Sequence, residues 1–213
     1  MNLPFDGSRF QALKFTPKPA DYADAGHFAV AAVTGTMAAG IAGNSEIFQF
    51  RWTSSALLAL IQEVRIDAMN SLGTGFTAGV GTFHLTAARG WSAAGTGGGA
   101  MTLTGNTNKL RTAMAGTAVG EIRVATTAAL GAGTKTLDGN SLAYTKATIS
   151  AATNTVFLGG TTGPVRLWAP DVGSGEHPLI LAANEGFVVR GTVPATGTWE
   201  IAIGVRWAEV PAY

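Results

Sequence analysis

The last apolar segment of the chain limits the fold more than any other feature. Large apolar residues occupy alternate positions there: Trp199, Ile201, Ile203, Val205 and Trp207. The residues between them are small or charged: Glu200, Ala202, Gly204 and Arg206. Side chains of a β-strand alternate between its two faces, so this pattern predicts one buried and one exposed face. We expect a strand about 30 Å long, preceded by a strand at 187–193 and a hairpin loop at 194–197.

Short β-type runs separated by turn residues fill the chain after residue 45. Apolar and β-branched residues gather at 47–52, 64–68, 79–87, 100–103, 109–114, 121–126, 134–137, 155–158 and 165–168. Gly, Asn, Asp and Pro between these runs supply turn chemistry. We find no convincing helix period and no repeat of fixed length. The sequence therefore predicts an all-β fold, an antiparallel β-sandwich, with a jelly roll as the favoured version at 213 residues.

The first 44 residues differ from the rest. Phe5, Phe10 and Phe15 are spaced every five residues, which fits neither a helix nor a strand, and three prolines precede residue 20. We expect an extended N-terminal arm whose phenylalanines contact a capsid or a neighbouring subunit. A frayed terminus is the alternative. Residues 27–33 and 37–42 predict a short hairpin, so the expected parts are 1–44 and a sandwich domain at 45–213.

The charge balance argues against nucleic-acid and membrane partners. The chain has 14 Lys and Arg against 13 Asp and Glu, and the basic residues form no cluster of the kind that DNA or an anionic membrane requires. No apolar run approaches the about 20 residues of a membrane span, and no signal-peptide pattern opens the sequence. The absence of cysteine excludes disulfides. Only 13% of residues are charged, which is typical of a surface covered by partner proteins.

The sequence predicts no catalytic, cofactor or metal site. His84 lies between two apolar residues and is expected on the solvent face of a strand. His27 and His177 lack the additional ligands or the nucleophile that metal binding or a catalytic triad requires. Glycine-rich segments at 73–78 and 95–100 match a dinucleotide fingerprint, but neither precedes a helical pattern.

Three glutamates offer one alternative, a catalytic pair of carboxylates. Glu46, Glu63 and Glu121 lie on predicted strands, and a jelly roll can bring two acids close enough for glycoside hydrolysis. The favoured interpretation is that they face outward. We expect them to pair across strands with three arginines: Arg51, Arg65 and Arg123.

Two of the five tryptophans are candidates for a surface role. Trp199 and Trp207 share the apolar face of the last strand and are expected in the core. Trp91, beside a glycine tract, and Trp168, before Ala169 and Pro170, are expected at the surface. There they would contact a partner or, in a carbohydrate-binding module, stack on sugar rings.

Several segments resemble structural proteins of tailed-bacteriophage particles. In the C-terminal part these are 175–179, 183–190 and 192–199, and earlier in the chain 46–52, 65–66, 83–91 and 108–111. The resemblance covers about residues 45–210 and leaves out the N-terminal arm. It carries no catalytic motif.

The resemblance implies a virion protein, made in the host cytoplasm and located on the capsid surface. Among such proteins, a jelly-roll cement or decoration protein fits the size and composition. It would bind the major capsid protein at capsomer junctions, as a homotrimer. A tail or adsorption protein is the alternative within the same particle, because such proteins are also rich in β-structure.

Overall fold

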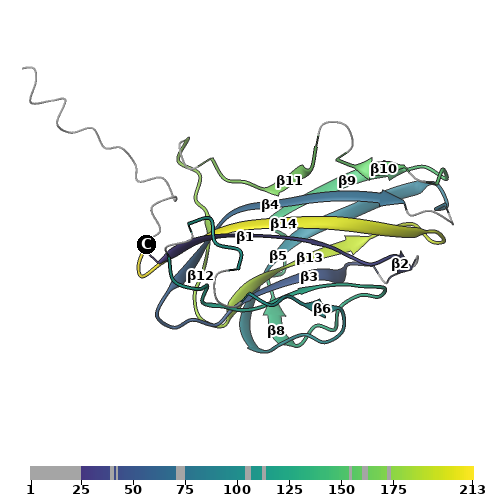
Figure 1. Ribbon diagram of the computed structural model, residues 1–213. Helices are drawn as coiled ribbons and strands as arrows, with labels where there is room; N and C mark the ends of the chain where they lie inside the picture. Colours follow the sequence, from purple (N-terminus) through teal and green to yellow (C-terminus); the bar gives the residue numbers. More distant parts are fainter. Residues whose placement is uncertain are drawn as a thin grey trace, which may run out of the picture.

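The computed structural model describes residues 25–38, 41, 43–70, 75–103, 107–111, 114–153, 155–159, 163–171 and 174–213. Within these ranges the regular structure consists of β-strands, with no α-helix (Figure 1). Phe5, Phe10 and Phe15 lie outside the described residues, so the predicted arm contacts stay predictions.

The strands form two seven-stranded sheets. The first contains β1 (Gly26–Val33), β2 (Met37–Ala38), β4 (Leu58–Asn70), β10 (Val156–Leu158), β11 (Val165–Trp168), β12 (Leu179–Leu181) and β14 (Thr198–Val210). The second contains β3 (Ser45–Trp52), β5 (Gly79–Ala93), β6 (Gly99–Ala100), β7 (Val119–Val124), β8 (Thr134–Leu137), β9 (Ala143–Ile149) and β13 (Glu185–Thr192). The predicted all-β fold is confirmed.

The order of the strands makes the sandwich a jelly roll. In the first sheet β14 lies between β1 and β4, and β10, β11 and β12 pair in turn with the other side of β4. In the second sheet β13 lies between β3 and β5, and β8 and β9 both pair with β5. All these pairings are antiparallel, and the chain passes from β3 to β4 and from β13 to β14 by changing sheets. This interleaving of two Greek keys is the jelly-roll topology.

The core lies between the sheets and follows the alternation of β14. Its five large apolar side chains are all buried, as predicted. Aromatic rings connect the sheets: Trp207 meets Phe50 of β3 with ring centroids 5.2 Å apart, and Trp199 meets Phe83 of β5 at 5.9 Å. Each of these rings is 0% exposed. Burial of large aromatic surfaces from both sheets therefore holds the sandwich closed.

Two local predictions at the ends of the chain are wrong. The hairpin predicted from 27–33 and 37–42 is not formed by β1 and β2, because each of these strands pairs with β14. Within the described residues the first strand of the sandwich is β1, which we had assigned to the N-terminal part. The loop at 194–197 is not a hairpin either, since β13 and β14 lie in different sheets.

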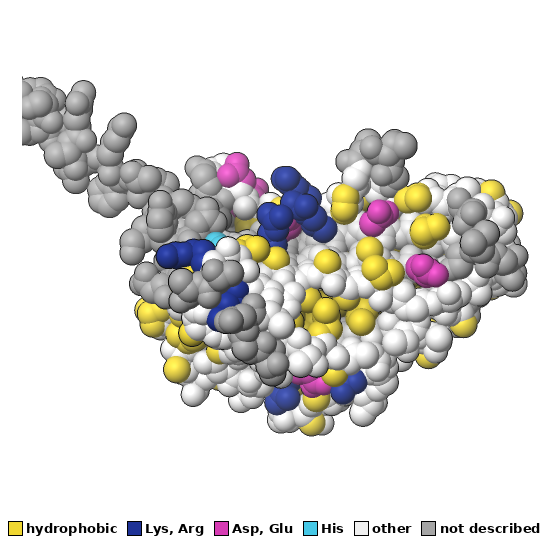
Figure 2. All heavy atoms as spheres, in the orientation of Figure 1, with side chains coloured by type: hydrophobic (Ala, Val, Ile, Leu, Met, Phe, Trp, Pro, Cys, Tyr) yellow, Lys and Arg dark blue, Asp and Glu magenta, His cyan; other side chains and the backbone are white. Residues whose placement is uncertain are grey.

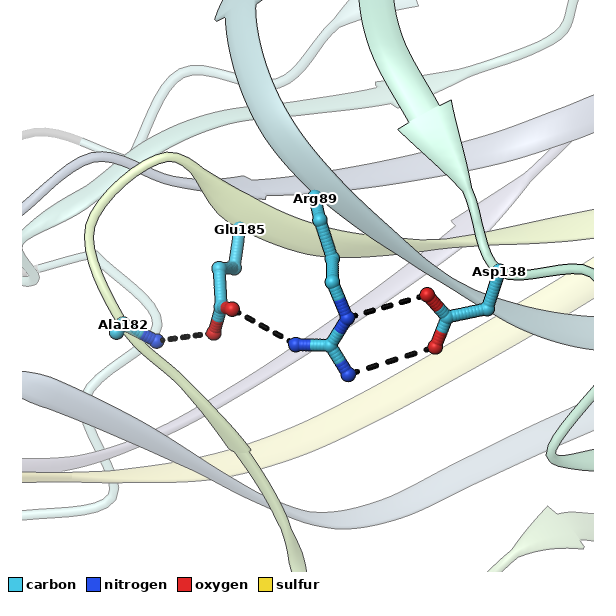
Figure 3. Close-up of polar contacts among 4 residues, drawn as sticks. All are labelled: Arg89, Asp138, Ala182 and Glu185. Atoms are coloured by element: carbon cyan, nitrogen blue, oxygen red, sulfur yellow. Dashed lines mark hydrogen bonds and ion pairs between the residues drawn. The ribbon is translucent and has the colours of Figure 1, made fainter.

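A charged bridge fixes the end of β5 to two neighbouring segments (Figure 3). Arg89 Nε donates to Asp138, just after β8, at 3.1 Å, and its Nη1 donates to Glu185, at the start of β13, at 2.8 Å. The second oxygen of Glu185 accepts a hydrogen bond from the backbone N–H of Ala182 at 2.8 Å. Asp138, and then Glu185, raise the pKa of Arg89. The bridge holds the loop before β13 against β5.

Glu209, near the end of β14, is a buried carboxyl with 0% exposure. It accepts hydrogen bonds from Thr117 Oγ1 at 2.5 Å, from the backbone N–H of Ala118 at 3.1 Å and from Trp207 Nε1 at 3.1 Å. Burial raises the pKa of Glu209, and these three donors offset the effect only in part. The carboxyl thus attaches the segment before β7 to the first sheet.

Replacing Glu209 with glutamine should flatten part of the pH dependence of stability. A carboxyl with a raised pKa binds more protons in the folded state, so its contribution falls as pH rises from its ordinary value of 4.5. The free energy of unfolding of the wild type, relative to Glu209→Gln, should decrease from below that pH towards neutrality. Denaturant titrations across this range measure the difference. A relative increase with pH would mean that the donors stabilise the carboxylate more than burial disfavours it.

Candidate functional site

A shallow trench of about 450 Å³ crosses the outer face of the first sheet. Its floor is β14, at Ala202 and Gly204. One side is formed by β1 and the other by charged residues of β4, including Arg65. Figure 2 shows this face, with hydrophobic side chains gathered in a central hollow and basic side chains along one rim.

The trench follows from the same alternation that builds the core. The residues of β14 that point away from the core include Ala202, with only a methyl group, and Gly204, with no side chain, so they do not cover the strand. A Cβ atom added to Gly204 would lie 3.9 Å from the carbonyl oxygen of Val30, its nearest neighbour, so the space above it is open. On β1 the outward residues are also small, and Val33 is 61% exposed. Small side chains on two neighbouring strands therefore leave an apolar hollow.

Three arginines surround one glutamate along the rim. Glu63 Oε1 lies 2.5 Å from Arg65 Nε and 3.4 Å from Arg166 Nε, and its Oε2 lies 3.7 Å from Arg206 Nε. The three basic residues come from β4, β11 and β14, and the side chains of Arg166 and Arg206 are 69% and 54% exposed. One carboxylate cannot neutralise three guanidinium groups. Asp67 of β4 also lines the trench, so three arginines face two carboxylates and the rim carries one uncompensated positive charge.

Within the part of the chain that the structure describes, β1 lies at the edge of the first sheet, and only the first half of its outer edge is paired. The backbone carbonyl of His27 accepts from Leu110 N–H at 2.9 Å, and Ala29 N–H donates to the carbonyl of Asn108 at 3.0 Å. Backbone groups of alternate residues point to the same edge, so the N–H and C=O groups of Ala31 and Val33 also point outward, beside the trench. Thr34 N–H points the other way and donates to β14. No segment within the described ranges pairs with this second half. An extended segment of another molecule can pair with it while its side chains enter the trench.

The expectation that Trp91 lies at the surface is wrong. The side chain is 1% exposed, and its Nε1 donates to the carbonyl of Ala93 at 3.0 Å. Lys135 Nζ lies 4.3 Å from the centre of the ring. Trp168, on β11, is half-buried. Trp91 therefore offers no open ring face for a sugar, and an exposed aromatic residue of the second sheet is Tyr144, at 67%.

The three glutamates lie apart, each with its own basic partner. Glu63 is on the outer face of the first sheet with the three arginines, whereas Glu46 pairs with Lys135 and Glu121 with Arg123 on the second. Arg51, the third arginine expected to pair with these glutamates, instead donates to the carbonyls of Trp91 and Ser92. The structure therefore brings no two of these carboxylates together for glycoside hydrolysis.

The histidines are also separate from one another. His84 lies beside Tyr144 on the second sheet, with ring centroids 6.0 Å apart, and burial followed by the charge of Arg190 lowers its pKa. His27 is buried, and His177 is exposed. Among the residues that the structure places, no three His, Asp or Glu side chains gather as metal ligands.

Comparisons with known proteins give no indication of function, so the fold and the trench are the observations that bear on it. No family model, curated protein or solved structure matches the chain. In the part of the chain that is described, no helix is long and apolar enough to cross a membrane. The resemblance to phage structural proteins stays a prediction.

Proposed function

We propose that the protein is a structural virion protein that binds the outer surface of a phage head at capsomer junctions and stabilises the shell. In this proposal the partner is the major capsid protein and the assembled form is a homotrimer. The observation that carries it is the trench on the outer face of the first sheet, with the free half of β1 beside it. Such a surface is suited to docking an extended segment of a partner protein.

The chemistry of the trench specifies the docked segment. Its small, apolar floor accepts apolar side chains, and the rim of Arg65, Arg166 and Arg206 favours a carboxylate next to them. The free N–H and C=O groups of β1 favour an extended backbone. We therefore expect the capsid protein to contribute a strand with apolar residues and an adjacent Asp or Glu. Three copies in a trimer would bind several capsid subunits at once and gain avidity.

Removing residues 1–20 tests the role of the predicted arm. The truncated protein should fold, because the described sandwich begins only at Gly26. It should bind purified heads at least tenfold more weakly, since the phenylalanines of the arm would no longer contact the capsid or a neighbouring subunit. Co-sedimentation with heads measures the binding, and circular dichroism checks the fold. Full binding by the truncated protein would show that the arm is dispensable.

The same experiment separates the head from the tail. If the protein sediments with tails and not with heads, the adsorption-apparatus alternative replaces the capsid proposal. Binding to neither particle, together with a change in tryptophan fluorescence on addition of glycans, would favour a carbohydrate-binding module.

A further inference from the structure

A buried polar cluster lies on the outer face of the second sheet, away from the trench. Glu46 and Gln49 project from β3, and Lys135 reaches them from β8. The segment before β8 covers the cluster: Leu130 N–H donates to the carbonyl of Glu46 at 2.8 Å, and the carbonyl of Gly131 accepts from Gln49 Nε2 at 2.9 Å. The cluster is therefore closed between a strand and a covering loop.

One carboxylate oxygen holds an amine and a carboxamide together. Lys135 Nζ donates to Glu46 Oε2 at 2.8 Å, and Gln49 Nε2 donates to the same oxygen at 2.6 Å. The side chains of Lys135 and Glu46 are 1% and 8% exposed, and Gln49 is 2% exposed. The ring of Trp91 closes one side. A nucleophile, a proton carrier and an acyl group are thus assembled with little access for water.

The carbonyl side of the Gln49 amide is the unusual feature of the cluster. Its Oε1 is buried and has no hydrogen-bond partner within the described ranges, whereas Nε2 has two acceptors. Buried polar atoms are nearly always paired, so an unpaired one requires an explanation. The oxygen of the amide is thus left unbonded, while its nitrogen, the atom that would leave in an attack on Cδ, is held by two acceptors.

We propose that Lys135 and Gln49 become joined by an amide bond, with Glu46 as the group that moves protons. The ammonium of Lys135 gives a proton to Glu46, and the neutral Nζ attacks Cδ of Gln49. The bond between Cδ and Nε2 then breaks as the new bond between Nζ and Cδ forms. Nε2 takes the second proton that Nζ loses and leaves as ammonia, which then takes up the proton held by Glu46, so the products are the cross-link and one ammonium ion. No oxidant or other co-reactant is required.

Such a bond would connect two distant segments of a chain that has no cysteine. It would attach β8 and the covering loop to β3, which lies on the far side of β13 and β5 in the sheet. A covalent connection of this kind restricts the unfolded chain much as a disulfide does, and it needs no oxidising compartment. The inference is independent of the proposed function.

The intact mass of the full-length protein tests the proposal. We expect a mass lower than that of the sequence by one ammonia molecule. Trypsin should then fail to cut after Lys135 and should release a branched peptide that joins residues 15–51 to residues 124–146. The branched peptide distinguishes the cross-link from ammonia loss at an asparagine.

Three variants complete the test. Lys135→Arg and Glu46→Gln should retain the full mass, because the first removes the amine nucleophile and the second the proton carrier. Lys146→Arg, at an exposed lysine of β9, should behave as the wild type. A wild-type protein at the full sequence mass would overturn the proposal. Ammonia loss that persists in Lys135→Arg would also overturn it, and a cross-link in Glu46→Gln would overturn the role of Glu46.

Discussion

Replacing Trp207 with alanine is expected to lower the free energy of unfolding by about 3–5 kcal/mol. Trp207 is fully buried, stacks on Phe28 at 5.4 Å within its own sheet and meets Phe50 of the other sheet at 5.2 Å. Its removal leaves a cavity between the sheets. It also removes the Nε1 donor of the buried Glu209, which would then have one fewer hydrogen bond. Because domains are stable by only about 5–15 kcal/mol, the loss is a large share of the total.

Arg206→Ala is the control for this variant. Arg206 is adjacent in sequence but points to the outer face, with its side chain 54% exposed, and its distance to Glu63 is 3.7 Å. Its replacement should change stability by less than about 1 kcal/mol. Thermal and denaturant unfolding of both variants measure the difference. If Trp207→Ala were as mild as Arg206→Ala, the two sheets would not be held together by this aromatic contact.

Replacing Gly204 with leucine should weaken binding to the partner at least tenfold while leaving the protein folded. The position has room, because the nearest atoms to an added Cβ are 3.9 and 4.0 Å away. Leucine also suits the middle of a strand better than glycine does. Its side chain would stand in the floor of the trench and exclude the docked segment. We expect at least a tenfold loss of affinity, or about 1.4 kcal/mol, with no loss of thermal stability.

Gly139→Leu is the matched control. Gly139 is exposed in the loop after β8 of the second sheet, and an added Cβ meets nothing within 4 Å. The substitution adds the same side chain away from the trench and should leave binding unchanged. Equal binding by both variants would mean that the trench is not the docking surface, and equal loss would mean that added surface leucine is itself disruptive.

The sequence predicted the strands whose own residues carry a clear pattern, above all β14. The alternation of β14 is visible because five large apolar residues follow one another on one face. Strand β11 was also predicted, at its observed bounds. Residues 109–114 were predicted as a strand, but among the described residues of that range Lys109 alone forms a bridge, with Phe28 of β1. Strand β9 was missed because its exposed face carries Tyr144, Lys146 and Thr148, while the other face has small residues until Ile149 at its end. A strand of this kind depends on β5 for its pairing, which local sequence does not reveal.

Long-range pairing accounts for the remaining differences. The first strand of the sandwich pairs with the last, so no local boundary could show that residue 26 belongs to it. Likewise, Trp91 lies beside glycine and serine in sequence, but the segment around Lys135 covers it from a distance of more than 40 residues. Turn chemistry at 194–197 indicates a reversal and does not tell a hairpin from a change of sheet.

The candidate site was only partly visible in the sequence. Ala202 and Gly204 were correctly placed on the face away from the core, whereas the covered surface inferred from the low charge stays a prediction. What could not be predicted is that β1 places its own small residues beside them. The three arginines of the rim come from three strands, and their convergence on Glu63 follows from strand order alone.

Electron cryomicroscopy of purified particles tests the central claim most directly. The account predicts jelly-roll density at the capsomer junctions, with the outer face of the first sheet turned towards the capsid and a capsid strand lying in the trench beside β1. Density confined to the tail, density that contacts the shell only through the second sheet, or absence from the particles would contradict it.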